Sequence, residues 1–124
     1  MLAERTVVIV DDDRAAAASV AALIMSLGMK SRIHHSAESF LESCGESPAD
    51  CLVLDLRLSG MSGLELQETL AAQSMEIPTI VVSGHADGDI SGKVLANGAI
   101  AVLEKPYDGA RLCAAIRTAL DRSG

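Results

Sequence analysis

Short apolar segments alternate with helical patterns along the whole chain, and this alternation constrains the fold more than any other feature. Each apolar segment has the length and β-branched content of a strand, and a stretch with helical character follows it. The expected strands are residues 6–10, 31–35, 51–54, 79–82 and 99–103. Strands that alternate with helices form parallel sheets covered on both faces. We therefore expect one α/β domain over residues 1–124, a doubly wound sandwich around a five-stranded parallel sheet.

The second expected strand differs from the others because most of its residues are polar. Its sequence is SRIHH, whereas the other four strands are almost wholly apolar. Interior parallel strands are buried on both faces, so a polar strand belongs at an edge. Neighbouring side chains of a strand point to opposite faces. We therefore expect His34 and His35 to be surface residues that do not bind a metal as a pair.

The expected helices carry recognisable boundary signals. Apolar residues recur at helical spacing in the first helix, at Val20, Leu23, Ile24 and Leu27. Gly28 follows them and can end the helix in a left-handed conformation. Ser62 and Glu65 form the Ser-x-x-Glu pattern of a capping box at the start of the third helix. The other helices are expected at about residues 37–44, 87–97 and 108–121, and the fourth is expected to be the least rigid because it begins among glycines.

Composition and charge exclude several classes of protein. The formal net charge of -7 opposes binding to a phosphate backbone, so we expect no direct contact with nucleic acid. The longest apolar run, AAAASVAALIM, is too short and too rich in alanine to span a bilayer. The first residues, MLAERTVV, lack the layout of a secretory signal. The expected location is therefore the cytoplasm, without membrane contact.

The three cysteines give no sign of a metal or redox site. Cys44, Cys51 and Cys113 are an odd number and lack the spacing of metal ligands or of a redox motif. Reduced structural thiols are the expected state.

Chemically useful residues follow the carboxyl ends of four expected strands. Asp11 and Asp12 follow the first strand and Asp55 follows the third. Ser83 follows the fourth strand and Lys105 follows the fifth. In doubly wound sheets such residues converge on one rim. If the first and third strands are neighbours, the three carboxylates share a pocket.

Carboxylates this close repel one another unless one is protonated or a cation binds. Magnesium prefers oxygen ligands and binds through one or two carboxylates together with a phosphate. A phosphoryl group polarised in this way can be attacked by a carboxylate, which then becomes an aspartyl phosphate. Asp55 is the best candidate nucleophile because it ends an interior apolar strand, CLVLD. Ser83 and Lys105 can contact phosphoryl oxygens.

These motifs resemble the receiver domain of two-component response regulators over essentially the whole chain. The matching segments are VIVDDD, LVLDLRLSGMSGLEL, VVSGHAD and LEKPY. SGHAD and EKPY are most similar to the nitrogen-fixation transcriptional regulators. The resemblance implies a flavodoxin-like (βα)5 fold with strand order 2-1-3-4-5.

The resemblance also implies a role for each residue of the site. Asp55 is the phosphoacceptor, with Ser83 and Lys105 as its catalytic partners. The implied metal is Mg²⁺ or Mn²⁺, held by carboxylates and by the backbone carbonyl of Arg57. The metal-binding side chains are Asp11, Asp12 and Asp55. The peptide bond between Lys105 and Pro106 is expected to be cis.

The implied function is that of a phosphorylation-controlled signalling module, not of an enzyme with an external substrate. A sensor histidine kinase or histidine phosphotransfer domain donates the phosphoryl group, and the domain catalyses only this transfer and its own dephosphorylation. Phosphorylation then reshapes the face made by the fourth helix, the fifth strand and the fifth helix. An effector domain or a downstream protein receives the signal. Phosphorylation-dependent homodimerisation through helices 87–97 and 108–121 remains an alternative.

One position departs from the pattern of the family. Many receivers carry Tyr or Phe three residues before the lysine, where this chain has Val102. Coupling through a rotating aromatic ring is therefore in question, and Tyr107 is a candidate substitute. His85 and Arg57 are candidates for tuning the loss of the phosphoryl group, although His85 can equally be an ordinary loop residue.

Other functions remain as alternatives. A phosphatase similar to the haloacid dehalogenases would use Asp11 as nucleophile and Asp13 two residues later, but it leaves Asp55 without a role. A flavodoxin-like flavin binder would need aromatic residues, which make up only 2% of the chain. A receiver that acts only as a docking module, without phosphorylation, is the third alternative. Asp13 by itself is expected to cap the first helix.

Overall fold

The computed structural model describes residues 5–43, 49–84 and 88–123. Its five strands form one parallel sheet in the order β2-β1-β3-β4-β5. The strands are β1 (Thr6–Val10), β2 (Lys30–His34), β3 (Cys51–Asp55), β4 (Thr79–Ser83) and β5 (Ala101–Glu104). The doubly wound parallel sheet and the strand order 2-1-3-4-5 are thereby confirmed.

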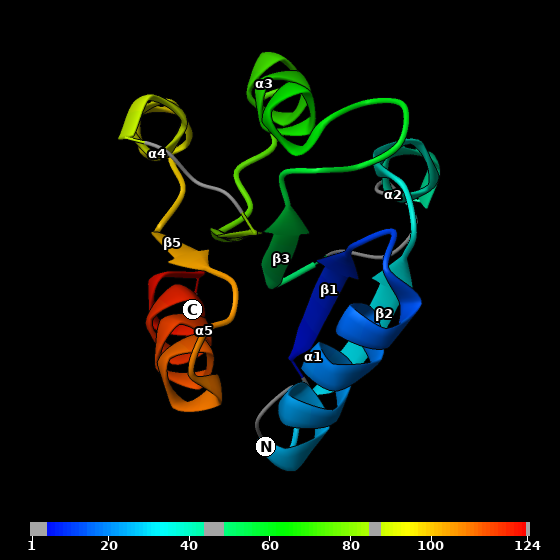
Figure 1. Cartoon of the computed structure of the whole chain (residues 1–124), viewed down its shortest axis with the longest axis vertical. Helices are drawn as coiled ribbons and strands as arrows, with labels where there is room; N and C mark the ends of the chain where they lie inside the picture. Colours follow the sequence, from blue (N-terminus) through cyan, green and yellow to red (C-terminus); the bar gives the residue numbers. More distant parts are fainter. Residues whose placement is uncertain (1–4, 44–48, 85–87, 124) are drawn as a thin grey trace.

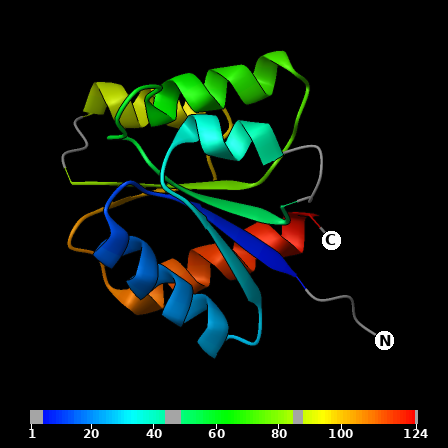
Figure 2. The ribbon, with the colours of Figure 1, turned by 90° about the vertical axis from the view of Figure 1, so that its right-hand side faces the viewer.

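Helices cover both faces of the sheet, as Figures 1 and 2 show. The helices are α1 (Arg14–Ser26), α2 (Ala37–Ser43), α3 (Gly63–Ala72), α4 (Gly88–Ala96) and α5 (Gly109–Ser123). On one face α1 and α5 pack against the sheet, and α2, α3 and α4 lie on the other. β3 and β4 are buried along their whole length because they lie inside the sheet and are covered on both faces. No described helix is long and apolar enough to cross a membrane.

The polar strand β2 lies at the edge of the sheet, as its composition predicts. His34, at the end of this strand, and His35, which follows it, are half-buried and so are less exposed than the sequence predicts. His34 contacts the hydroxyl groups of Ser39 and Ser43 at 2.8 and 3.2 Å and meets the Phe40 ring edge-on. Burial chiefly lowers the pKa of His34.

Two helices begin at the caps that the sequence indicates. The Asp13 carboxylate accepts hydrogen bonds from the backbone N–H groups of residues 15 and 16 at the start of α1. Ser62 and Glu65 form the complete capping box of α3. At the other end of α1, Gly28 has a φ of 80°, a left-handed conformation that glycine adopts at little cost.

The fifth strand begins two residues later than the sequence predicts. Ala99 still donates its backbone N–H to the carbonyl oxygen of Val94, at 3.0 Å, in the turn that ends α4. Gly98 precedes it with a φ of 102°. The Ile100 N–H then donates to the Thr79 carbonyl oxygen of β4 at 2.8 Å, and β5 itself begins at Ala101.

The described cysteines are free thiols. Cys51 is fully buried in β3 and Cys113 is half-buried in α5. Burial raises the pKa of the Cys51 thiol to about 12, so it stays protonated and inert at neutral pH. Cys44 lies outside the described residues.

Candidate functional site

Two carboxylates and one ammonium group meet at the carboxyl edge of the sheet. Lys105 Nζ lies 2.9 Å from Asp55 Oδ2 and 3.4 Å from Asp11 Oδ2. Asp11 and Asp55 are 2% and 6% exposed, so both carboxylates are largely removed from water. They meet because β1 and β3 are neighbours, and Lys105 follows the end of β5. The structure thus brings together three of the residues that the sequence singles out.

The electrostatics of this cluster show opposed effects. Burial raises the pKa of Asp11, and the charge of Asp55 adds to this, while the hydrogen bond from the Asp13 backbone and the charge of Lys105 act against it. Burial disfavours the charged form of Lys105, but the hydrogen bond and charge of Asp55 outweigh it, so its pKa is raised. The ammonium group therefore stays charged and partly neutralises the two carboxylates.

Asp55 is fixed by its surroundings on two sides. The backbone N–H of Arg57 donates to Asp55 Oδ1 at 2.9 Å, opposite the oxygen that Lys105 contacts. The first residue of α3, Gly63, packs directly against the Asp55 backbone, and a Cβ there would lie 2.5 Å from the Asp55 carbonyl oxygen. Glycine is therefore required at this position for α3 to approach the end of β3.

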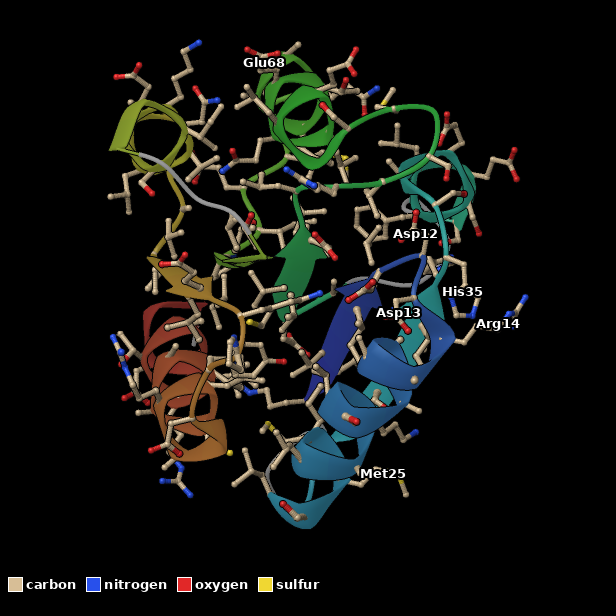
Figure 3. All side chains as sticks on the ribbon, viewed as in Figure 1. Asp12, Asp13, Arg14, Met25, His35 and Glu68 are labelled. Atoms are coloured by element: carbon tan, nitrogen blue, oxygen red, sulfur yellow. The ribbon has the colours of Figure 1, made fainter. Side chains whose placement is uncertain are left out.

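Asp12 does not join the other two carboxylates. Its side chain is exposed, and Oδ2 accepts hydrogen bonds from both the backbone N–H and the hydroxyl group of Ser59, each at 3.2 Å. Figure 3 shows Asp12 on the connection between β1 and α1. Among the described residues no group of three His, Cys, Asp or Glu side chains is arranged to hold a metal ion.

Ser83 and Lys105 are linked through the backbone. Ser83 ends β4 and is 1% exposed, and its carbonyl oxygen accepts a hydrogen bond from the Lys105 N–H at 2.7 Å. The peptide bond between Lys105 and Pro106 is cis, as expected. This arrangement places the serine and lysine on neighbouring strand ends at the same edge of the sheet.

Val102, which stands where many receivers have Tyr or Phe, and Tyr107, its candidate substitute, have different environments. Val102 packs with Val81 and Val94 in a small apolar cluster under α4. Tyr107 is half-buried and packs against the core on the α1 and α5 side. Burial chiefly raises the pKa of Tyr107; the charge of Lys105 opposes this shift, and the charges of Asp11 and Asp55 add to it. Tyr107 thus lies on the side of the sheet covered by α1 and α5, whereas Val102 is partly buried on the α4 side.

Sequence reasoning missed several contacts around the site. His35 Nδ1 donates to the Asp11 carbonyl oxygen at 3.0 Å, and its Nε2 lies 3.4 Å from Arg14 Nη1 (Figure 3). Glu38 of α2 accepts a hydrogen bond from the Met61 N–H at 3.0 Å, in the connection between β3 and α3. No periodicity or motif points to these contacts, because each joins segments that are distant in sequence. His85 lies outside the described residues.

The donor atoms at this edge suit a hard divalent cation. The buried groups are carboxylate oxygens, which Mg²⁺ prefers, and a cation already bridges two of them in the form of the Lys105 ammonium group. Two buried carboxylates beside one ammonium group leave an excess of negative charge. The residues present therefore fit Mg²⁺, and Asp11 and Asp55 are the buried carboxylates that would hold it.

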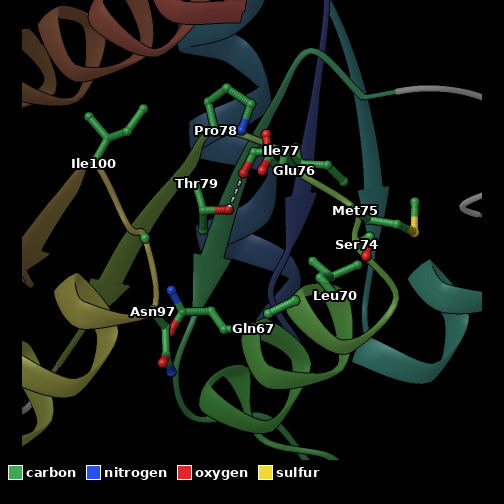
Figure 4. Close-up of a pocket in the computed structure, with 12 residues that line it drawn as sticks. Gln67, Leu70, Ser74, Met75, Glu76, Ile77, Pro78, Thr79, Asn97 and Ile100 are labelled. Atoms are coloured by element: carbon green, nitrogen blue, oxygen red, sulfur yellow. Dashed lines mark hydrogen bonds between the residues drawn. The ribbon is translucent and has the colours of Figure 1, made fainter.

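A hollow without a cluster of charged residues lies at the opposite edge of the sheet. It has a volume of about 720 Å³ and lies between α3, the start of β4 and the turn after α4 (Figure 4). Gln67 lines it and donates a hydrogen bond to the Val94 carbonyl oxygen at 3.1 Å. Glu76 is its only acidic or basic lining residue, so it lacks the charged cluster found at the carboxyl edge.

Comparison with known proteins agrees with this geometry. The sequence profile of the response regulator receiver domain matches residues 7–117. The response regulator protein TmoT of Ectopseudomonas mendocina is 40% identical over 94% of this chain and 53% of its own length. The transcriptional regulatory protein FixJ of Azorhizobium caulinodans is 39% identical over 93% of this chain and 54% of its own length. The chain thus spans about half the length of these relatives.

A solved structure described as FixJ-N covers 97% of this chain and 96% of its own length, with 34% identity and a TM-score of 0.88. The structure of the response regulator StyR covers 98% of this chain and 61% of its own length, with 38% identity and a TM-score of 0.89. The family profile, the relatives and the solved structures all match nearly the whole chain. The chain therefore belongs to the receiver domain family of two-component response regulators.

Proposed function

We propose that this receiver accepts a phosphoryl group on Asp55 and that phosphorylation switches its contacts with other proteins. The observation that carries the proposal is the position of Asp55: a buried carboxylate beside Asp11, in direct contact with Lys105. The Lys105 ammonium group lies close enough to Asp55 to neutralise negative charge that develops during phosphoryl transfer. The other Asp55 carboxylate oxygen is held by the Arg57 backbone N–H. Positioning and charge neutralisation are the main contributions of proteins to phosphoryl transfer.

In the transfer, an Asp55 carboxylate oxygen attacks phosphorus and forms the new P–O bond. The P–N bond of a phosphohistidine donor breaks at the same centre, and its electron pair returns to the imidazole nitrogen. Lys105 moves from the carboxylates to a phosphoryl oxygen, and the Ser83 hydroxyl group donates to another. A bound Mg²⁺ or Mn²⁺ supplies charge neutralisation, with Asp11, Asp12, Asp55 and the Arg57 carbonyl as its proposed ligands. Hydrolysis of the aspartyl phosphate by water resets the domain.

The proposed partners follow from membership of the family. A sensor histidine kinase or a histidine phosphotransfer domain, acting in the cytoplasm, donates the phosphoryl group. The switched surface is the face of α4, β5 and α5, which contacts an effector domain, a downstream protein or a second copy of the chain. Leu95 of α4 is 48% exposed and is an apolar side chain available for contact with a partner. The relatives' names indicate transcriptional regulation as the class of output.

The alternative functions find less support in the site. A phosphatase of the haloacid dehalogenase type would need Asp13 free for proton transfer, but that carboxylate caps α1. It would also leave the contact between Lys105 and Asp55 without a purpose. A purely structural docking module would need no buried pair of like charges, which is costly to keep in a folded protein.

The test is the intact mass of the protein after incubation with Mg²⁺ and acetyl phosphate. We expect a gain of one phosphoryl group that requires the metal and is absent from Asp55→Asn. The substitution Glu68→Gln, at an exposed position of α3, serves as the matched control and should label like the wild-type protein. Equal labelling of Asp55→Asn, or no labelling of the folded wild-type protein, would contradict the proposal.

A further inference from the structure

The carboxylate of Asp12 is held by a partner that has no role in the chemistry described so far. Both hydrogen-bond donors of Ser59, the backbone N–H and the hydroxyl group, point at the same oxygen, Asp12 Oδ2, at 3.2 Å. The two residues are 47 positions apart, so the contact joins the β1–α1 connection to the β3–α3 connection. A carboxylate with two donors is oriented, whereas a free one at the surface samples several rotamers.

The connection that carries Ser59 is anchored independently of Asp12. Glu38 accepts the Met61 N–H at 3.0 Å, and the Gly63 N–H donates to the Leu56 carbonyl oxygen at 3.0 Å. The hydrogen bond from Met61 is the main reason why the pKa of Glu38 is lowered, which keeps Glu38 ionised and able to accept this bond. Ser59 therefore lies in a segment that is held by hydrogen bonds other than those to Asp12.

The charge distribution explains why such a hold is useful. Lys105 contacts Asp11 and Asp55 but not Asp12. A third carboxylate turned towards this pair would add repulsion to a site that already holds two buried carboxylates. Ser59, on the β3–α3 connection, instead provides two hydrogen-bond donors to the Asp12 carboxylate.

We propose that Ser59 is a positioning residue that holds Asp12 away from the buried carboxylates until a divalent cation binds. The inference rests on the proposed function, in which Asp12 is one of the metal ligands. The Ser59 donors compete with the cation for the same carboxylate, so they weaken metal binding. Removing them should tighten Mg²⁺ binding, the opposite of the usual effect of a substitution beside a binding site.

The expected size follows from the strength of hydrogen bonds. One bond of this kind contributes roughly 0.5–1.5 kcal/mol net. Its loss corresponds to a roughly twofold to tenfold decrease in the Kd for Mg²⁺. Ser59→Ala removes the hydroxyl donor and should give the smaller effect. Ser59→Pro removes both donors and should give the larger one.

The experiment is an isothermal titration of the metal-free protein with MgCl₂ at constant ionic strength. Ser59→Thr keeps both donors and should bind Mg²⁺ like the wild-type protein. Ser26→Ala removes an exposed serine hydroxyl at the end of α1 and is the matched control. A second readout is the amide NMR signal of Ser59, which should shift on saturation with Mg²⁺ because its N–H loses the Asp12 carboxylate.

The outcomes separate this inference from the proposed function. Tighter binding in Ser59→Ala and Ser59→Pro, with a shifted Ser59 signal in the wild-type protein, supports it. Unchanged or weaker binding in Ser59→Ala overturns it, even if Ser59→Pro fails to fold. An unshifted Ser59 signal at saturation also overturns it, although Mg²⁺ binding itself then upholds the proposed metal site. If the wild-type protein binds no Mg²⁺, the proposed function fails as well.

Discussion

At the scale of single residues, the charged cluster of Asp11, Asp55 and Lys105 lowers the stability of the folded protein. Two carboxylates are buried with one ammonium group between them. Burial favours the protonated form of Asp11, so its pKa in the folded protein lies above the ordinary value of 3.8. The folded protein therefore binds this proton more tightly than the unfolded chain does, and ionised Asp11 lowers the stability of the metal-free protein.

Asp11→Asn should therefore stabilise the metal-free protein at pH 7. We expect the free energy of unfolding to rise by roughly 1 kcal/mol, the usual scale for a change of this kind. Because stability is lost as pH rises from 3.8 through the raised pKa of Asp11, the gain should shrink as the pH is lowered towards 3.8. Urea unfolding at pH 7 and at pH 4.5 measures this difference. A destabilised variant at pH 7, or an equal gain at both pH values, would contradict this view of Asp11.

The sequence predicts which residues gather here better than it predicts their contacts. Asp11, Asp55 and Lys105 each follow a strand end, so topology alone brings them together. Asp12 shares that position in the sequence, yet its side chain turns to Ser59. A short exposed side chain is oriented by neighbours that only the folded chain supplies, and nothing in the pattern around Ser59 reveals such a contact. The catalytic and metal-binding roles of these residues stay predictions.

At the scale of elements, the start of α3 is the helix end most closely tied to the site. The absence of a side chain at Gly63 lets the helix begin against the Asp55 backbone, and the capping box of Ser62 and Glu65 fixes where it begins. The capping pattern was readable from the sequence. The close approach at Gly63 was not, because it depends on how the helix packs against the end of β3.

Gly63→Ala should destabilise the protein because the added Cβ would lie 2.5 Å from Asp55 O and 2.8 Å from Leu56 Cα. Backbone atoms cannot yield like a flexible side chain, so we expect a loss of roughly 1–3 kcal/mol. Gly92→Ala in α4 is the control, because its Cβ would meet nothing within 4 Å. It should stabilise the protein by about 0.5–1 kcal/mol, the helix preference of alanine over glycine. Urea unfolding of both variants checks this pair, and equal effects would refute the steric argument.

At the scale of the whole molecule, alternation of strands and helices was enough to predict the doubly wound sheet. The polar composition of SRIHH placed β2 at an edge, and the structure agrees. The complete strand order came from the resemblance to receivers, because apolar content alone does not rank the remaining strands. Strand ends were less predictable, as the late start of β5 shows, since hydrogen bonds after α4 determine it.

A divalent cation that binds at the proposed site should stabilise the whole molecule, because only the folded chain forms this site. At a free Mg²⁺ concentration about ten times the Kd, the free energy of unfolding should rise by about 1.4 kcal/mol. Thermal unfolding with and without MgCl₂ measures this, with KCl at equal ionic strength as the control. Asp55→Asn should lose most of the gain. An equal rise in the variant would mean that the cation acts elsewhere on this acidic protein.

The contact between Lys105 and Asp11 joins residues 94 positions apart in the chain. During synthesis, the lysine leaves the ribosome long after both carboxylates. A nascent or truncated polypeptide that ends before β5 therefore lacks the cation that neutralises its acidic side chains. If Asp55 receives the phosphoryl group as proposed, such a chain also lacks the ammonium group that is proposed to contact a phosphoryl oxygen.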